Sequence, residues 1–189
     1  MTERVHRYRT RCSWSGSTAA GYEGYDRSHD GVVVHAGDDG RAATGDSNVA
    51  ALAPGSDDGR AATGDSNVAA LALSSDAAFR GDPSRLNPEQ LLVLAASSCQ
   101  LLAFLAVAAR ARVDVVAYED DAEGVMPATK GRTGLTSIVL RPRVTFGASG
   151  RVPSPERFAH LVEVAHRECF IANSLSTPVT VEPELVVAE

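Results

Sequence analysis

Two cysteines, Cys99 and Cys169, are the residues of this chain whose type and position could do chemistry. Each lies in one of the two longest apolar segments. A buried thiol is most often inert packing, and burial statistics alone favour that role for both. Two thiols on opposed core helices could instead form a redox pair, because a cysteine oxidised by peroxide can condense with a neighbouring thiol. A redox pair is therefore the first hypothesis, and inert packing is its alternative.

Two further residues are candidates for the same chemistry, namely His166 and Cys12. His166 lies one helical turn before Cys169, so the two side chains share a helix face. A Cys–His pair could activate a thiolate or bind a metal, but the additional ligands that zinc needs are missing from the pattern. We therefore predict no metal site. Cys12 lies on the first strand without a partner pattern, and we expect it to be packing.

A redox thiol needs a cation nearby. Burial in apolar surroundings raises the pKa of a thiol, whereas the attacking species is the thiolate. A fixed guanidinium would favour the thiolate and bind peroxide oxygens. Arg27, Arg80 and Arg85 lie in loops on the way to the first long helix, and each could equally be an ordinary surface residue. Glu89 either compensates the helix dipole or holds such an arginine.

Two helices should carry the cysteines. The same start pattern, a cap residue followed by proline and glutamate, occurs at residues 87–89 and 154–156. The first helix should run apolar to Ala109 and close on Arg110 and Arg112. The second has apolar residues at helical spacing and should reach Cys169 near its end.

Short apolar or alternating segments predict strands around these helices. They are residues 5–14, 22–25, 32–34, 68–73, 113–118, 135–146 and 179–187, with Pro142 favouring an edge or a bend. Strands, a long helix, a strand pair, a second helix and a last strand make an α+β domain.

Length and charge narrow the function classes. The chain has 189 residues, which suits one domain, and a net charge of −6, which argues against a nucleic-acid partner. The N-terminus has no apolar run after its charges, and three cysteines without a secretory signal favour a reducing compartment. We expect a cytoplasmic protein.

One segment is long enough to cross a membrane. Residues 90–109 carry no charge, which is about the length of a spanning helix. Ser97, Ser98 and Gln100 lie at its centre, where a bilayer penalises polar groups. We therefore expect a helix buried in a protein core and no membrane partner.

The chain also contains an exact internal repeat. Residues 38–53 and 57–72 have the same sequence, and two copies are too few for a repeat architecture. We expect a single domain over 1–189 with a duplicated loop insertion at about 36–67, whose first copy has no packing role. Such insertions are tolerated because loop-closure entropy grows slowly with length.

Several motifs together resemble one family. The run NPEQLL, the cysteine ten positions after its glutamate, and the later HRECFIANS are similar to the OsmC/Ohr family of organic hydroperoxide reductases. The opening WSGS and the segment FRGDPSRLNPEQ fit the OsmC branch. The resemblance covers roughly residues 5–35 and 70–188.

This resemblance implies an intertwined α+β homodimer with two active sites at the subunit interface. It implies a peroxidatic cysteine at Cys99, a resolving cysteine at Cys169 and the motif glutamate at Glu89. The arginine is Arg80 in the branch that we favour, or Arg27 in the other. The family often has proline after the second cysteine, where this chain has Phe170.

The activity implied is reduction of organic hydroperoxides to alcohols, with Cys99 forming a sulfenic acid that Cys169 resolves to a disulfide. A lipoyl-type dithiol would restore both thiols, and no metal or organic cofactor is implied. The alternative is a non-catalytic module of the same fold that binds a small molecule or lipid.

Helix geometry adds one independent point. Ten residues of straight helix separate Glu89 from Cys99 by about 15 Å, which a single arginine does not easily span. If both serve one site, the helix bends or the two residues come from different subunits.

Overall fold

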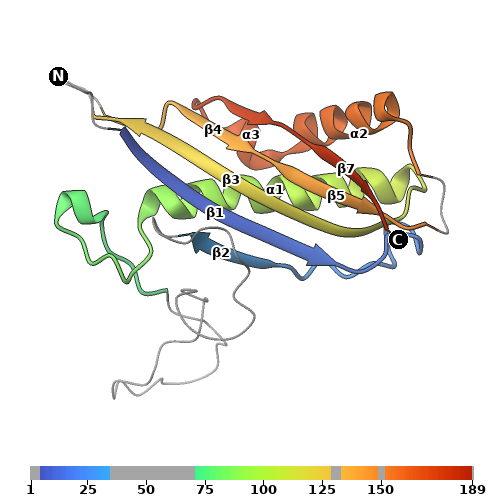
Figure 1. The fold of residues 1–189 in the computed structure, drawn as a ribbon, viewed down its shortest axis with the longest axis horizontal. Coiled ribbons are helices and arrows are strands. Elements are labelled where there is room, and N and C mark those ends of the chain that lie inside the picture. The colour runs from blue at the N-terminus through green and yellow to red at the C-terminus, as the bar shows by residue number, and fades with distance from the viewer. Residues whose placement is uncertain (1–4, 35–70, 129–132, 149–151, 189) are drawn as a thin grey trace, which may run out of the picture.

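The computed structural model describes residues 5–34, 71–128, 133–148 and 152–188 (Figure 1). Within these ranges one sheet is covered on one face by helices, as the α+β prediction requires. The insertion predicted at about 36–67 lies outside the described residues. The predicted homodimer remains a prediction, because a single chain is described.

The strands form one mixed sheet. Their order is β2-β1-β3-β4-β6, with β5 pairing a second stretch of β3 and β7 pairing β5. Most pairs are antiparallel, whereas β4–β6 and β5–β7 are parallel. The strands are β1 (Val5–Ser15), β2 (Asp30–Val34), β3 (Val115–Pro127), β4 (Ser137–Leu140), β5 (Pro142–Phe146), β6 (Val179–Val181) and β7 (Glu184–Val187).

Two predicted strands are each broken into two. The segment 135–146 divides into β4 and β5 before Pro142, at the bend that the proline predicts. At the break, the backbone N–H of Arg141 donates to Asp120 Oδ1 at 2.6 Å, so a side chain replaces a ladder partner. The segment 179–187 divides in the same way into β6 and β7.

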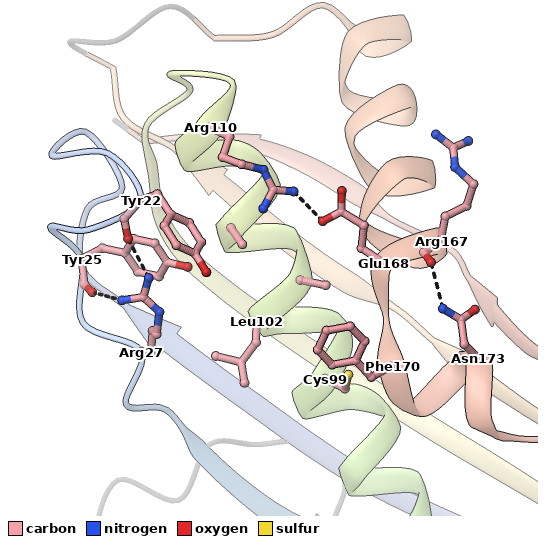
Figure 2. Close-up of a pocket in the computed structure, with 12 residues that line it drawn as sticks. Tyr22, Tyr25, Arg27, Cys99, Leu102, Arg110, Arg167, Glu168, Phe170 and Asn173 are labelled. Carbon is pink, nitrogen blue, oxygen red and sulfur yellow. Dashed lines mark hydrogen bonds and ion pairs between the residues drawn. The ribbon is translucent and has the colours of Figure 1, made fainter.

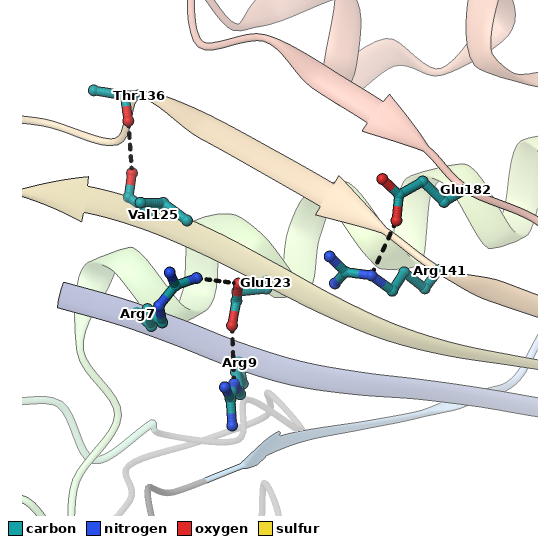
Figure 3. Close-up of polar contacts among 7 residues, drawn as sticks. All are labelled: Arg7, Arg9, Glu123, Val125, Thr136, Arg141 and Glu182. Atoms are coloured by element: carbon teal, nitrogen blue, oxygen red, sulfur yellow. Dashed lines mark hydrogen bonds and ion pairs between the residues drawn. The ribbon is translucent and has the colours of Figure 1, made fainter. Parts of the chain in front are cut away.

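Alternation along β1 gives the sheet two different faces. Tyr8, Thr10 and Cys12 are buried on the helix side. The residues between them, Arg9 and Arg11, point outward, and each pairs with an acid of β3. Figure 3 shows the pair of Arg9 with Glu123, which Arg7 also joins. The period of two predicted for this segment is therefore confirmed.

Helix α1 (Pro88–Arg110) lies along the inner face of the sheet (Figure 1). It begins in a capping box, in which Asn87 accepts from the Gln90 N–H and the Gln90 side chain accepts from the Asn87 N–H. The helix is long and apolar enough to span a membrane, but half of its most apolar window is buried inside the domain. It is the core helix of this domain.

Three further helical segments complete the described part of the fold. Helix α2 (Pro155–Glu168) is capped by Ser154 and lies against α1. A short helix α3 (Phe170–Ser174) follows it, and a 3-10 turn η1 (Ala77–Phe79) precedes α1. The aromatic rings of Phe104, Phe146 and Phe158 meet edge to face between α1, α2 and β5, which fixes α2 on the end of α1.

One strand prediction is wrong, and a second is tested only in part because residues 68–70 lie outside the described ranges. Residues 22–25 form turns, because Gly21 and Gly24 bend the chain where two tyrosines had suggested a strand. Of the candidate 68–73, the described part contains only an isolated bridge from Leu73 to Leu86.

Candidate active site

The two cysteines meet between helices α1 and α3. Cys99 lies in the middle of α1, and the backbone N–H of Ile171 in α3 donates to its sulfur at 3.4 Å. Cys169 is the single extended residue between α2 and α3, and it is 1% exposed. Burial, together with the neighbouring Cys99 side chain, raises the pKa of the Cys169 thiol to about 11. Both thiols are free, and Cys99 is the more accessible of the two.

The break between α2 and α3 brings this pair together. Cys169 leaves the helical region (φ −72°, ψ 106°), so the chain turns and α3 restarts against the middle of α1. The second cysteine therefore lies at a helix junction and not, as the sequence predicted, near the end of one continuous helix. Because Cys169 lies at a bend in the chain, a small backbone movement at this junction can shift its thiol.

Cys99 opens onto a cavity of about 530 Å³ (Figure 2). Its floor is one face of α1, because Cys99, Leu102, Ala106 and Arg110 follow at three- and four-residue spacing. The other walls come from the loop after β1 and from the junction of α2 with α3. The cavity is lined by Tyr22, Tyr25, Arg27, Cys99, Leu102, Ala103, Ala106, Arg110, Arg167, Glu168, Phe170 and Asn173.

Arg27 is held in this cavity by aromatic rings and carbonyl groups. Its guanidinium carbon lies 4.9 Å and 4.3 Å from the ring centres of Tyr22 and Tyr25. Its two terminal nitrogens donate to the carbonyls of Tyr25 and Tyr22 at 3.1 Å and 2.6 Å. Within the described ranges no carboxylate forms a salt bridge with it, and in Figure 2 the side chain points toward the tyrosines.

The other two predicted site residues lie elsewhere in the chain. Arg80 is exposed at the end of η1, in a left-handed conformation (φ 66°), and does not line the cavity. Glu89 is half-buried in the first turn of α1, where with burial and Asp76 it helps to raise the pKa of Tyr8. One chain therefore brings Cys99 and Arg27 to one cavity, with Cys169 buried beside Cys99, and leaves Arg80 and Glu89 apart from it.

Comparison with known proteins supplies the family. The model of the OsmC-like protein family matches residues 81–184, which include helices α1, α2 and α3, with Cys99 and Cys169. The chain belongs to this family. No match is found among curated proteins.

Solved structures of OsmC-like proteins agree with the architecture. An OsmC-like protein of unknown function from Vibrio cholerae is 38% identical, with a TM-score of 0.51 over 55% of this chain and 67% of that one. An organic hydroperoxide resistance protein OsmC from Legionella pneumophila is 21% identical, with a TM-score of 0.50 over 61% of this chain and 80% of that one. At 21% identity, the second comparison shows only that the fold is shared.

Phe170 lines the edge of this cavity, at the position where the resemblance leads one to expect proline. Its side chain is 80% exposed and stands next to Cys169. A phenylalanine keeps a backbone N–H and leaves φ free, so the first turn of α3 is less constrained than a proline would make it.

Two polar contacts beside Cys99 were not foreseen. Ser97 donates to the buried carboxylate of Asp120 on β3 at 2.5 Å. Ser98 is joined to His29, just before β2, at 2.7 Å. The signal was present in the sequence, because two serines in the middle of an otherwise apolar helix need polar partners. Pattern alone does not say which distant residues supply them.

Two residues considered from the sequence stand outside the cavity. His166 does not line it, and the described residues contain no group of three potential metal ligands. Cys12 is fully buried beneath α1, where burial raises the pKa of its thiol to about 11.

Proposed function

We propose that this protein is a thiol-dependent peroxidase that reduces organic hydroperoxides to alcohols. The observation that carries the proposal is the position of Cys99, which touches Cys169 and its helix junction on one side and an apolar cavity on the other. A peroxidatic thiol that is resolved within its own chain needs both neighbours: space for a substrate and a second thiol within reach. Membership of the OsmC-like family agrees with this role.

The reaction divides into two steps. The Cys99 thiolate attacks the distal oxygen of the hydroperoxide, the O–O bond breaks, and the alkoxide takes a proton and leaves as an alcohol. Cys99 is then a sulfenic acid. The sulfur of Cys169 attacks the Cys99 sulfur, water leaves, and a disulfide forms. A dithiol, of the lipoyl type by resemblance, reduces this disulfide by exchange.

The burial of Cys169 suits the second role better than the first. Its raised pKa leaves it protonated at neutral pH, so it is a poor first nucleophile. Cys99 is more accessible and opens onto the cavity. A resolving thiol can act after a small movement of the junction, once the sulfenic acid has formed.

For the cation we propose Arg27, which lines the cavity of Cys99 within one chain. The sequence resemblance favoured Arg80, with Glu89 as its partner. Those two residues could serve the same site only from a second subunit or after a change of conformation. Three arginines line the cavity, and Arg110 and Arg167 form salt bridges with Glu168 and Glu163. Among the described residues Arg27 has no such partner, which leaves its charge for the site.

The walls of the cavity favour an apolar substrate. Leu102, Ala103 and Ala106 supply aliphatic surface, and Tyr22 supplies an aromatic ring. Apolar lining with few polar groups is typical of sites for organic ligands. An organic hydroperoxide should therefore be preferred over hydrogen peroxide. We propose that the protein works in the cytoplasm as a homodimer.

The experiment is a peroxidase assay with cumene hydroperoxide and dihydrolipoamide. The wild type should consume peroxide, Cys99→Ser should be inactive, and Cys12→Ser should keep its activity. In Cys169→Ser, a dimedone adduct should form on Cys99. After one equivalent of peroxide, mass spectrometry of the wild type should show a Cys99–Cys169 disulfide. Binding of the hydroperoxide without turnover, or a disulfide to Cys12, would contradict the proposal.

A further inference from the structure

The side chain of His29 joins the Arg27 backbone to the residue next to Cys99. Its Nδ1 lies 2.9 Å from the carbonyl oxygen of Arg27, and its Nε2 lies 2.7 Å from the hydroxyl of Ser98. A carbonyl can only accept, so Nδ1 carries a proton. In the neutral ring Nε2 then accepts from the Ser98 hydroxyl.

The loop that His29 ends is tied down at several other points. The Trp14 indole N–H donates to the carbonyl of Asp26 at 2.7 Å. The Asp26 carboxylate accepts from the backbone N–H and the hydroxyl of Ser28, each at 2.9 Å. These contacts hold the loop in one conformation, and they join residues within the loop or connect it to β1. The His29 contact to Ser98 connects the loop to helix α1 as well.

A contact to Ser98 also fixes the distance between the Arg27 loop and Cys99. The two residues are adjacent on α1, whose hydrogen-bonded backbone holds them at a constant separation. On the other side of the helix, Ser97 is fixed to Asp120 of β3. The stretch that bears Cys99 is therefore held to the sheet through Ser97 and to the Arg27 loop through Ser98.

We propose that His29 is a positioning residue that sets Arg27 relative to the Cys99 thiol. The proposal rests on the proposed function only in naming Cys99 as the reactive thiol. His29 touches neither substrate nor sulfur. It acts by fixing the backbone from which the Arg27 side chain enters the cavity, so its effect on Cys99 passes through the guanidinium.

A double-mutant cycle tests this path, because two residues that act through one interaction give non-additive effects. The readout is the rate at which iodoacetamide alkylates Cys99 at pH 7, measured on the Cys99 peptide by mass spectrometry. This rate follows the thiolate and needs no peroxide. The variants are His29→Ala, Arg27→Ala and the double variant.

His29→Ala should slow alkylation about two- to tenfold, the effect of one net hydrogen bond. Arg27→Ala should slow it more, and adding His29→Ala to Arg27→Ala should change nothing further. Ser98→Ala should reproduce the effect of His29→Ala. His160→Ala, a substitution of an exposed histidine on α2, should leave the rate unchanged. Additive effects in the cycle, or an unchanged rate in His29→Ala, would overturn the proposal.

A purely structural role gives a different pattern. If His29 only stabilised the loop, His29→Ala would lower the melting temperature and would slow alkylation equally with or without Arg27. A parallel assay with cumene hydroperoxide tests the peroxidase proposal separately from the proposal for His29. Non-additivity in alkylation without peroxide turnover would reject the peroxidase but keep His29, whereas turnover with additive alkylation effects would reject His29 alone.

Discussion

Charged side chains on the outer face of the sheet have carboxylate partners, whereas two charges on the helix side of the molecule have none among the described residues. On the outer face, Arg7 and Arg9 share Glu123, at 2.6 Å and 3.0 Å (Figure 3). Arg11 pairs with Asp121 at 2.7 Å. On the inner side, Arg27 stacks on tyrosines, and the Asp120 carboxylate accepts hydrogen bonds from Ser97 and from the Arg141 backbone. Neither of these two charges has a salt-bridge partner among the described residues.

The difference separates charges that serve folding from charges that can act on a ligand. The outer pairs follow from register, because Arg9 lies opposite Glu123 and Arg11 opposite Asp121 in the β1–β3 ladder. Their charge is locally neutralised. A guanidinium without a carboxylate keeps its positive charge for a thiolate or a peroxide. Perturbed or unpaired charges beside a cavity are therefore candidates for function.

The largest effect should follow from removing the unpaired arginine. Arg27→Ala loses a charge-assisted interaction of about 2–3 kcal/mol, so peroxide consumption should fall about thirty- to a hundredfold. Arg27→Lys should recover only part of it, because lysine lacks the planar fork. The steady-state assay with cumene hydroperoxide measures both.

The matched control comes from the outer face. Arg9→Ala removes an arginine of the same type from the paired set and should leave turnover unchanged. Arg80→Ala decides between the two arginines considered from the sequence. If Arg80→Ala is slow and Arg27→Ala is not, the cation of the site comes from the loop before α1.

Asp120 should make stability depend on pH in an unusual direction. Burial raises the pKa of its carboxyl to about 6 from an ordinary 3.8, although hydrogen bonds from Ser97 and the Arg141 N–H oppose the rise. The folded state therefore binds the proton more tightly than the unfolded state. The contribution of this group is most favourable below pH 3.8 and declines as the pH rises through 6.

Urea unfolding measures this decline. Between pH 5 and 7 the wild type should lose about 1 kcal/mol of unfolding free energy to Asp120. Asp120→Asn, which keeps an acceptor for Arg141 and can donate to Ser97, should lack that part of the decline. Equal slopes in the two proteins would mean that Asp120 stays ionised throughout this range.

A smaller effect should follow from the aromatic support of Arg27. An exposed cation–π contact is worth about 0.5–1 kcal/mol, so Tyr22→Leu should lower peroxide consumption about two- to fivefold. Tyr22→Phe keeps the ring and should be close to the wild type. A faster Tyr22→Leu variant would instead mean that stacking holds Arg27 away from Cys99.

Local signals in the sequence were sufficient for most elements of the fold. The capping pattern at residues 87–89 predicted the start of α1, and alternation predicted β1. The strand expected at 22–25 was wrong because tyrosine favours strands only where the flanking glycines permit extension. The α2–α3 break at Cys169 was missed because its neighbours have ordinary helix propensities.

Only part of the candidate site could be predicted from the sequence. The resemblance named both cysteines, and the structure brings them together. The contact of His29 with Ser98 spans 69 residues and that of Ser97 with Asp120 spans 23, and tertiary packing alone determines such pairs. The choice between Arg27 and Arg80 depends on which loop covers the cavity, and local pattern does not contain that information.

The smallest effect should come from the paired face itself. Glu123 is half-buried, and although burial opposes it, hydrogen bonds and charge from Arg9 and Arg7 lower the pKa of its carboxyl. The stability it supplies is present above its unfolded pKa of about 4.5 and is lost as the pH falls through its folded value. Because both arginines are more than half exposed, solvent screens each pair to about 0.2–1 kcal/mol.

Glu123→Gln should therefore lower the unfolding free energy at pH 7 by about 1 kcal/mol or less, and 1 M salt should reduce the difference further. The difference between the two proteins should shrink as the pH falls through the lowered pKa of Glu123, because the wild-type carboxyl then becomes protonated. Peroxide consumption should not change at any salt concentration. If it does change, the outer ion pairs influence the cavity through the sheet, and the separation between charges for folding and charges for chemistry would fail at Glu123.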